Sequence, residues 1–95
     1  MYKHATSVAD RNFVMLYCES NGKGSKVGFS INKKYGKAVA RNRIRRQLKA
    51  VVNDIMPTVK DGYNVIFIPR RREKYLFEEV SRSVRALFCK AGLLQ

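Results

Sequence analysis

The feature that most constrains this chain is a long basic segment that must also fold as a helix. The stretch from Ser20 to Asn53 contains no acidic residue and holds ten of the chain's twenty Lys and Arg residues. Apolar residues recur in this stretch at helical spacing, which is not expected of an unstructured basic tail. They are Ala40, Ile44, Leu48, Val51 and Ile55. The pattern predicts a helix from about Lys37 to Ile55, with a cationic outer face, and Pro57 ends it near Met56.

The overall charge indicates a polyanionic partner. Twenty Lys and Arg against seven Asp and Glu give the 95 residues a formal net charge of +13. Basic side chains at this density release counterions on meeting a phosphate backbone, which favours nucleic acid. The length predicts one domain, residues 1–95. The longest apolar run, Val65 to Ile68, is too short for a bilayer and no signal pattern is present, so we expect a soluble, cytoplasmic protein with no membrane partner.

The rest of the chain predicts an α/β domain. Residues Arg11–Cys18 form a strand with apolar side chains on both faces, so we expect a central strand covered on both faces. A glycine-bearing turn leads from it to a strand over Lys26–Ile31, which predicts a hairpin. A further strand, Tyr63–Ile68, follows the basic helix, and strand–helix–strand order implies that these last two strands are parallel. Residues Thr6–Ala9 are a possible short first strand.

A second amphipathic helix is predicted from Glu73 to Lys90, ending near Gly92. Its outer face carries charged residues, including Glu78 and Arg82. Its apolar stripe comprises Leu76, Val80, Val84, Leu87 and Ala91, flanked by Phe77 and Phe88. Together the two helices and the strands predict a sheet with packed helices.

A specific motif surrounds the start of the basic helix. Residues 30–46 read SINKKYGKAVARNRIRR. This run resembles the signature of the bacterial ribonuclease P protein component, in which a strand ending in Lys-Lys passes through a glycine into a helix with an Arg-Asn-Arg motif. The region from Tyr2 to Val14 looks like that family's first strand. The resemblance therefore covers nearly the whole chain.

The resemblance implies an α/β sandwich similar to the second domain of ribosomal protein S5. Such a sandwich has a four-stranded sheet and a left-handed crossover through the basic helix. Physical reasoning alone predicts the opposite hand, because these crossovers are overwhelmingly right-handed. Family members usually begin with a further basic segment and a full amino-terminal helix, whereas this chain starts at Met1, where that helix would be ending. The resemblance thus implies that the amino-terminal helix, which walls the leader cleft in the family, is largely missing.

The resemblance also implies a function. The protein joins a catalytic RNA, and together they remove the 5′ leader from precursor tRNA. The RNA performs the hydrolysis with Mg²⁺. The family therefore implies that the protein alone binds no cofactor, contributes no catalytic residue and needs no obligate protein partner.

Candidate RNA-binding residues lie on the basic helix and at its start. On a helix, Arg41, Arg45 and Lys49 share one flank, where like charges repel rather than pair. Arg is favoured over Lys where several donors contact phosphate. The lysines at the helix start either bind a phosphate through charge and helix dipole or are an ordinary basic helix entry. The full set is Lys33, Lys34, Lys37, Arg41, Asn42, Arg43, Arg45, Arg46 and Lys49.

Candidate leader-binding residues are apolar or aromatic, because unpaired bases stack on such side chains. They are Tyr2, Phe13, Leu16 and Tyr17. Core packing competes with this role. The pattern favours the sheet core for Phe13 and the ligand for Tyr2, and leaves Tyr17 open. Leu16 is the alternative to Tyr17 in the family's cleft, because the register is uncertain by one residue.

A stand-alone basic nuclease or a ribosome-associated RNA-binding protein is the alternative function. A nuclease needs paired acid and base groups, or a carboxylate cluster that holds metal ions. The chain has one His and seven scattered acidic residues. Neither constellation is visible, so we expect no metal site and no catalytic site made by this chain alone.

Overall fold

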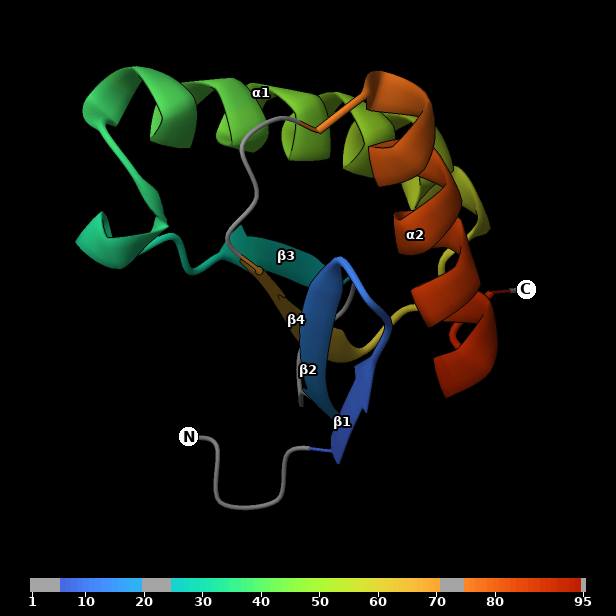
Figure 1. Cartoon of the computed structure of the whole chain (residues 1–95). Helices are drawn as coiled ribbons and strands as arrows, with labels where there is room; N and C mark the ends of the chain where they lie inside the picture. The colour runs from blue at the N-terminus through green and yellow to red at the C-terminus, as the bar shows by residue number, and fades with distance from the viewer. Residues whose placement is uncertain (1–5, 20–24, 71–74, 95) are drawn as a thin grey trace.

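A computed structural model describes residues 6–19, 25–70 and 75–94. These residues form a four-stranded mixed sheet with two α-helices on one face (Figure 1). The strands are β1 (Thr6–Ala9), β2 (Phe13–Glu19), β3 (Lys26–Phe29) and β4 (Tyr63–Pro69), and the helices are α1 (Ala38–Ile55) and α2 (Phe77–Ala91). Two short 3-10 helices, η1 (Lys33–Tyr35) and η2 (Met56–Thr58), flank α1. The α/β fold predicted from the sequence is confirmed.

The strand order is β1-β2-β4-β3, with β4 antiparallel to β2 and parallel to β3. The predicted central position of β2 and the parallel pairing of β3 with β4 are therefore correct. The predicted β2–β3 hairpin is wrong, because β4 lies between these two strands. Strand β4 is apolar on both faces, with Val65 and Phe67 buried on one and Ile66 and Ile68 half-buried on the other. An inner position suits such a strand better than an edge does.

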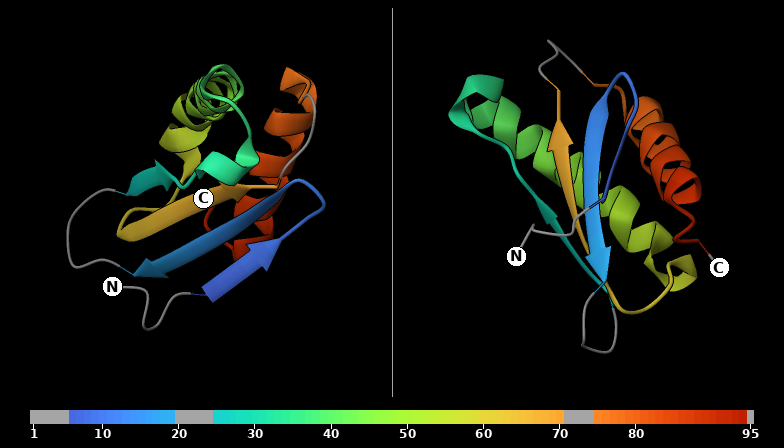
Figure 2. Two further views of the ribbon diagram at one scale, coloured as in Figure 1. Left: turned by 60° about the vertical axis from the view of Figure 1, so that its left-hand side comes forward. Right: turned by 90° about the horizontal axis from the view of Figure 1, so that it is seen from below.

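The crossover from β3 through α1 to β4 is left-handed. The right panel of Figure 2 looks at the sheet from the side away from the helices. In that view β3 and β4 both point up, β4 lies to the right of β3, and α1 passes behind the sheet. This is the rare hand for a parallel crossover, and it agrees with the hand that the family resemblance implies.

Helix α1 buries the predicted stripe. Ile44, Leu48, Val51 and Ile55 are all nearly inaccessible to solvent, and Ala40 is half-buried against the same core. The helix begins at Ala38 and ends at Ile55, before Pro57 in η2. Both ends agree with the prediction, because the 3.6-residue period and the proline are strong local signals.

Helix α2 starts later than predicted. It begins at Phe77, and residues 71–74, which include the predicted start at Glu73, lie outside the described residues. Its buried side packs against the core as predicted, but Leu76 and Phe77 are 55% and 51% exposed. Including Leu76 in the buried stripe was wrong, because it lies before the helix begins, and Phe77, predicted to flank the stripe, is exposed at the first position of the helix. The helix ends at Gly92, whose φ of 75° is a left-handed conformation that favours glycine.

The two faces of the sheet differ. Phe13 and Met15 of β2 are fully buried on the face that the helices cover. Val14, Leu16 and Cys18 point to the other face and are half-buried. Within the described ranges no helix covers this second face (Figure 2), which we call the open sheet face. The prediction that both faces of β2 are covered is therefore wrong for the described part of the chain.

Candidate nucleic-acid interface

The outer face of α1 is cationic. Because the apolar stripe at positions 44, 48, 51 and 55 faces the core, the opposite side of the helix points to solvent. The exposed polar residues of this face before Asn53 are Asn42, Arg43, Arg45, Arg46 and Lys49. The first acidic residue of α1 is Asp54, in its last turn. Five predicted RNA-binding residues thus form one surface, and no acidic residue lies among them in the sequence.

Arg41 differs from the other arginines of α1. It is half-buried, and its Nε atom is shielded from solvent without a hydrogen-bond acceptor among the described residues. Its guanidinium therefore offers less free surface to a ligand than its exposed neighbours do. Arg45 is oriented instead by a long contact, in which its Nη1 donates to Asn42 Oδ1 at 3.5 Å. Side chains held in place lose less entropy when they bind phosphate.

The entry to α1 adds three exposed lysines. Lys33 and Lys34 lie in η1, and Lys37 occupies the position before the first turn of α1. Gly36 connects the two helices with a φ of 157°, which an L side chain rarely adopts. No side chain caps the first turn of α1, and that turn has no acidic residue. The backbone N–H groups and the lysines together favour an anion there.

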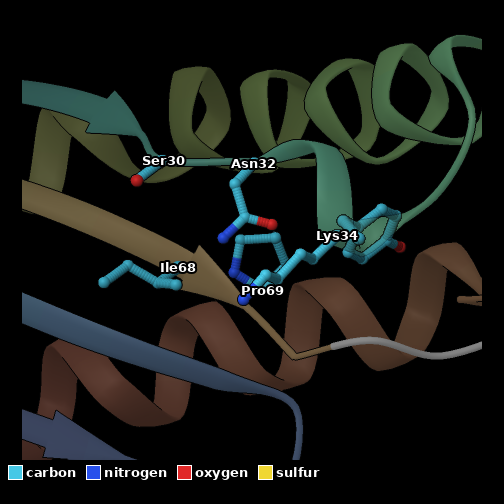
Figure 3. Close-up of a pocket in the computed structure, with 6 residues that line it drawn as sticks. Ser30, Asn32, Lys34, Ile68 and Pro69 are labelled. Carbon is cyan, nitrogen blue, oxygen red and sulfur yellow. The ribbon is translucent and has the colours of Figure 1, made fainter.

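A pocket lies between the segment that enters α1 and the end of β4. It has a volume of about 290 Å³ and is lined by residues that follow β3 and by the end of β4. Figure 3 shows Ser30, Asn32 and Lys34 on one side and Ile68 and Pro69 on the other. Cationic and apolar surfaces therefore meet at this point.

The leader-binding candidates differ in burial and in the face of the sheet on which they lie. Phe13 is fully buried, with its ring 5.3 Å from that of Tyr75 and 6.4 Å from that of Phe67, so it has no surface for a base. The sheet-core position that the pattern favoured for Phe13 is therefore confirmed, and Phe13 is no longer a candidate for leader binding. Tyr17 packs against the core from the same face, and Leu16 lies half-buried on the open sheet face. Tyr2 lies outside the described residues.

Sequence reasoning missed two aromatic residues near the interface. Tyr35 and Tyr75 stack with ring centroids 6.5 Å apart, although forty residues separate them in the chain. It also missed Ile66 and Ile68, which share the open sheet face with Leu16 through β2–β4 pairing. The strand geometry of β4, in which side chains alternate between the two faces, contained the signal that Ile66 and Ile68 share one face. No local signal places Tyr35 beside Tyr75.

The described residues show no site for independent metal chemistry. Within residues 6–19, 25–70 and 75–94, no three His, Cys, Asp or Glu side chains are grouped so that they could hold a metal ion. In the same ranges, neither helix is long and apolar enough to cross a membrane. The geometry that is present, cationic and apolar surfaces side by side, suits an RNA ligand.

Comparison with known proteins decides the family. Residues 1–92 match the Ribonuclease P family. The chain belongs to the ribonuclease P protein family. The ribonuclease P protein component of Symbiobacterium thermophilum is 38% identical over 97 residues, covering 100% of this chain and 84% of the relative. That of Clostridioides difficile is 36% identical over 89 residues, covering 92% and 78%.

Solved ribonuclease P proteins share the fold of this family member. The structure from Staphylococcus aureus superposes with a TM-score of 0.88 at 27% identity, covering 99% of this chain and 87% of that one. The structure from Thermotoga maritima gives a TM-score of 0.85 at 23% identity, covering 94% and 86%. The resemblance drawn from the motif around Arg41 to Arg43 is confirmed.

Proposed function

We propose that this chain is the RNA-binding subunit of ribonuclease P. It binds the catalytic RNA and the 5′ leader of precursor tRNA, and so assists removal of the leader in the cytoplasm. The observation that carries this proposal is the exposed cationic face of α1, within a stretch from Ser20 to Asn53 that has no acidic residue. Each phosphate contact there would release counterions and add to the affinity.

The proposed roles follow the surfaces. Arg41, Asn42, Arg43, Arg45 and Arg46 bind the catalytic RNA and its junction with precursor tRNA. The exposed lysines around η1, with Lys49 further along α1, neutralise additional phosphates. The open sheet face is where the unpaired leader lies, on apolar side chains that include Leu16.

The RNA supplies the chemistry in this proposal. Phosphodiester hydrolysis by a protein at neutral pH needs an acid–base pair or bound metal ions. We assign no catalytic residue and no resident cofactor to this chain, and the holoenzyme's Mg²⁺ ions belong to the RNA. The protein contributes position and charge neutralisation, which let two polyanions approach each other.

Reconstitution tests the proposal against the alternative of a stand-alone basic nuclease or a ribosome-associated RNA-binding protein. The purified protein is incubated with precursor tRNA and Mg²⁺, with and without the catalytic RNA. We expect no cleavage by the protein alone, and specific 5′ cleavage at low Mg²⁺ once both are present. Arg46→Ala should weaken this rescue, whereas Arg82→Ala, at an exposed position on α2, should not. Cleavage by the protein alone would establish the nuclease alternative.

A further inference from the structure

A groove runs between the start of α1 and the residues that enter α2. It has a volume of about 310 Å³, and its lining includes Tyr35, Lys37, Val39, Arg43, Gln47 and Tyr75. The backbone oxygen of Tyr75, two residues before α2, accepts a hydrogen bond from Gln47 of α1, so these residues lie side by side on the face of the sheet that the helices cover. This α1–α2 groove is therefore separate from the open sheet face. Its volume lies at the lower end of the range for small-ligand sites, roughly 300–1,000 Å³.

The floor of the α1–α2 groove is held in place by internal contacts. The ring of Tyr75 is stacked between Phe13 and Tyr35, at centroid distances of 5.3 Å and 6.5 Å. Its hydroxyl donates to the backbone oxygen of Asn12 at 2.9 Å, and its own backbone oxygen accepts from Gln47 Nε2 at 3.0 Å. A preformed floor lowers the ordering cost of binding a ligand.

Apolar surface is exposed along this groove. Three large hydrophobic side chains are exposed in the described part of the chain: Val39 at 80%, Leu76 at 55% and Phe77 at 51%. Val39 lines the groove, and the other two directly follow Tyr75. Val39, the most exposed of the three, therefore presents apolar surface at the preformed groove itself, where a ligand would cover it.

The charge of the groove indicates which class of ligand it binds. Lys37 and Arg43 line it and are exposed, and none of the described residues that line it is acidic. Apolar surface for a base, next to cations for the flanking phosphates, is the combination that binds single-stranded RNA. A peptide would need acidic groups at matching positions, whereas every RNA nucleotide supplies both a base and a phosphate.

We propose that the α1–α2 groove binds one unpaired base of an RNA, with its neighbouring phosphates on Lys37 and Arg43. The proposal rests on the RNA-binding function proposed above and adds a second base-binding site to it, on the opposite side of the sheet from the leader surface. The base lies against Val39, and the backbone of the RNA continues along the cationic face of α1.

Two oligomers separate base binding from charge attraction. A five-nucleotide oligoadenylate and an abasic ribose-phosphate chain of the same length are titrated into the isotopically labelled protein, and amide shifts are followed by NMR. We expect groove amides, such as those of Val39 and Gln47, to report severalfold tighter binding of the oligoadenylate, because only that chain carries a base that can cover the apolar surface of Val39.

Variants at exposed positions place the effect in the groove. Val39→Ser should lower the preference for the base-containing oligomer severalfold at the groove amides, and Val39→Leu should keep it. Ala50→Ser is the matched control, since Ala50 is exposed on the same helix and does not line the groove. None of these changes touches the core, so all variants should fold.

Four results would overturn the proposal. Equal binding of both oligomers at the groove would show charge attraction alone, and base-dependent shifts confined to the open sheet face would place the base there. Both results leave the proposed RNA-binding function standing. Groove amides that broaden with protein concentration in the absence of RNA would show that a second copy of the chain covers the groove. If neither oligomer binds anywhere, the proposed function itself fails.

Discussion

Helices α1 and α2 pack on the same face of the sheet through similar aliphatic stripes, yet their outer faces differ in charge. The outer face of α1 carries arginines and Lys49 without an acidic residue before Asp54. The outer face of α2 mixes Glu78 and Glu79 with Arg82 and Arg85. Packing therefore does not explain the charge of α1. The inner stripes serve folding in both helices, and only the outer face of α1 is suited to a polyanion.

The spacing of the charges sharpens the contrast. On α2, Glu78 precedes Arg82 by four residues, a favourable arrangement on a helix. On α1, Arg41, Arg45 and Lys49 follow one another at the same spacing and repel. A helix that had only to be solvated would gain by mixing signs. In the proposed complex, RNA phosphates would relieve this repulsion, so the charges of α1 cost some stability in the free protein and favour binding.

The largest expected effect concerns the buried apolar stripes, which both helices have. Ile44→Ala on α1 and Leu87→Ala on α2 should each lower the free energy of unfolding by roughly 2–5 kcal/mol, because both side chains are about 1% exposed and leave cavities. Urea denaturation measures both. A loss well under 1 kcal/mol for either variant would show that the stripe of that helix is not core.

The next prediction concerns the outer face of α1, where the two helices differ in charge. Arg43→Ala should leave the free energy of unfolding within about 0.5 kcal/mol of the parent, because the side chain is exposed. It should weaken binding to the catalytic RNA by about 1.5–3 kcal/mol if it removes a charge-assisted hydrogen bond. Filter binding and urea denaturation on the same preparation measure the two quantities. An unfolded Arg43→Ala variant would mean that the phase of α1 is wrong.

The smallest effect concerns the contact between the two helices. Arg85 Nη2 of α2 lies 2.7 Å from Asp54 Oδ2 of α1, with the side chains 51% and 71% exposed. Exposed ion pairs contribute little, so Asp54→Asn should cost less than about 1 kcal/mol of unfolding free energy. Thermal unfolding at low and high salt measures it. A larger loss that disappears in high salt would show that the pair does hold α1 and α2 together.

Much of the fold could be predicted because its signals are local. The stripe of α1, its stop at Pro57 and the end of α2 at Gly92 depend on periodicity and backbone preference over a few residues. The β2–β3 hairpin failed because pairing was decided by β4, which comes more than thirty residues after β3. Because β2 and β3 are close in sequence, they were expected to pair with each other, but β4 pairs with both of them and lies between them.

The candidate RNA-binding site, like the fold, could be predicted only in part. The cations of α1 follow directly from the helical phase of Ile44 and Leu48. The aromatic candidates could not be sorted, because β2 is apolar on both faces and its sequence alone does not tell which face the helices cover. Phe13 proved to be core, and Leu16 proved to lie half-buried on the open sheet face, for that reason. Tyr75 reaches Tyr35 only through the tertiary fold.

The salt dependence of binding to the catalytic RNA tests the difference between α1 and α2 most directly. Each phosphate contact contributes roughly 0.7–0.9 to the slope of log affinity against log salt. Arg46→Ala on α1 should therefore flatten the slope by about one contact, whereas Arg82→Ala on α2 should leave it unchanged. Both side chains are exposed arginines on helices, so the change in net charge is the same. Equal slopes for the two variants would contradict the assignment of RNA binding to the outer face of α1.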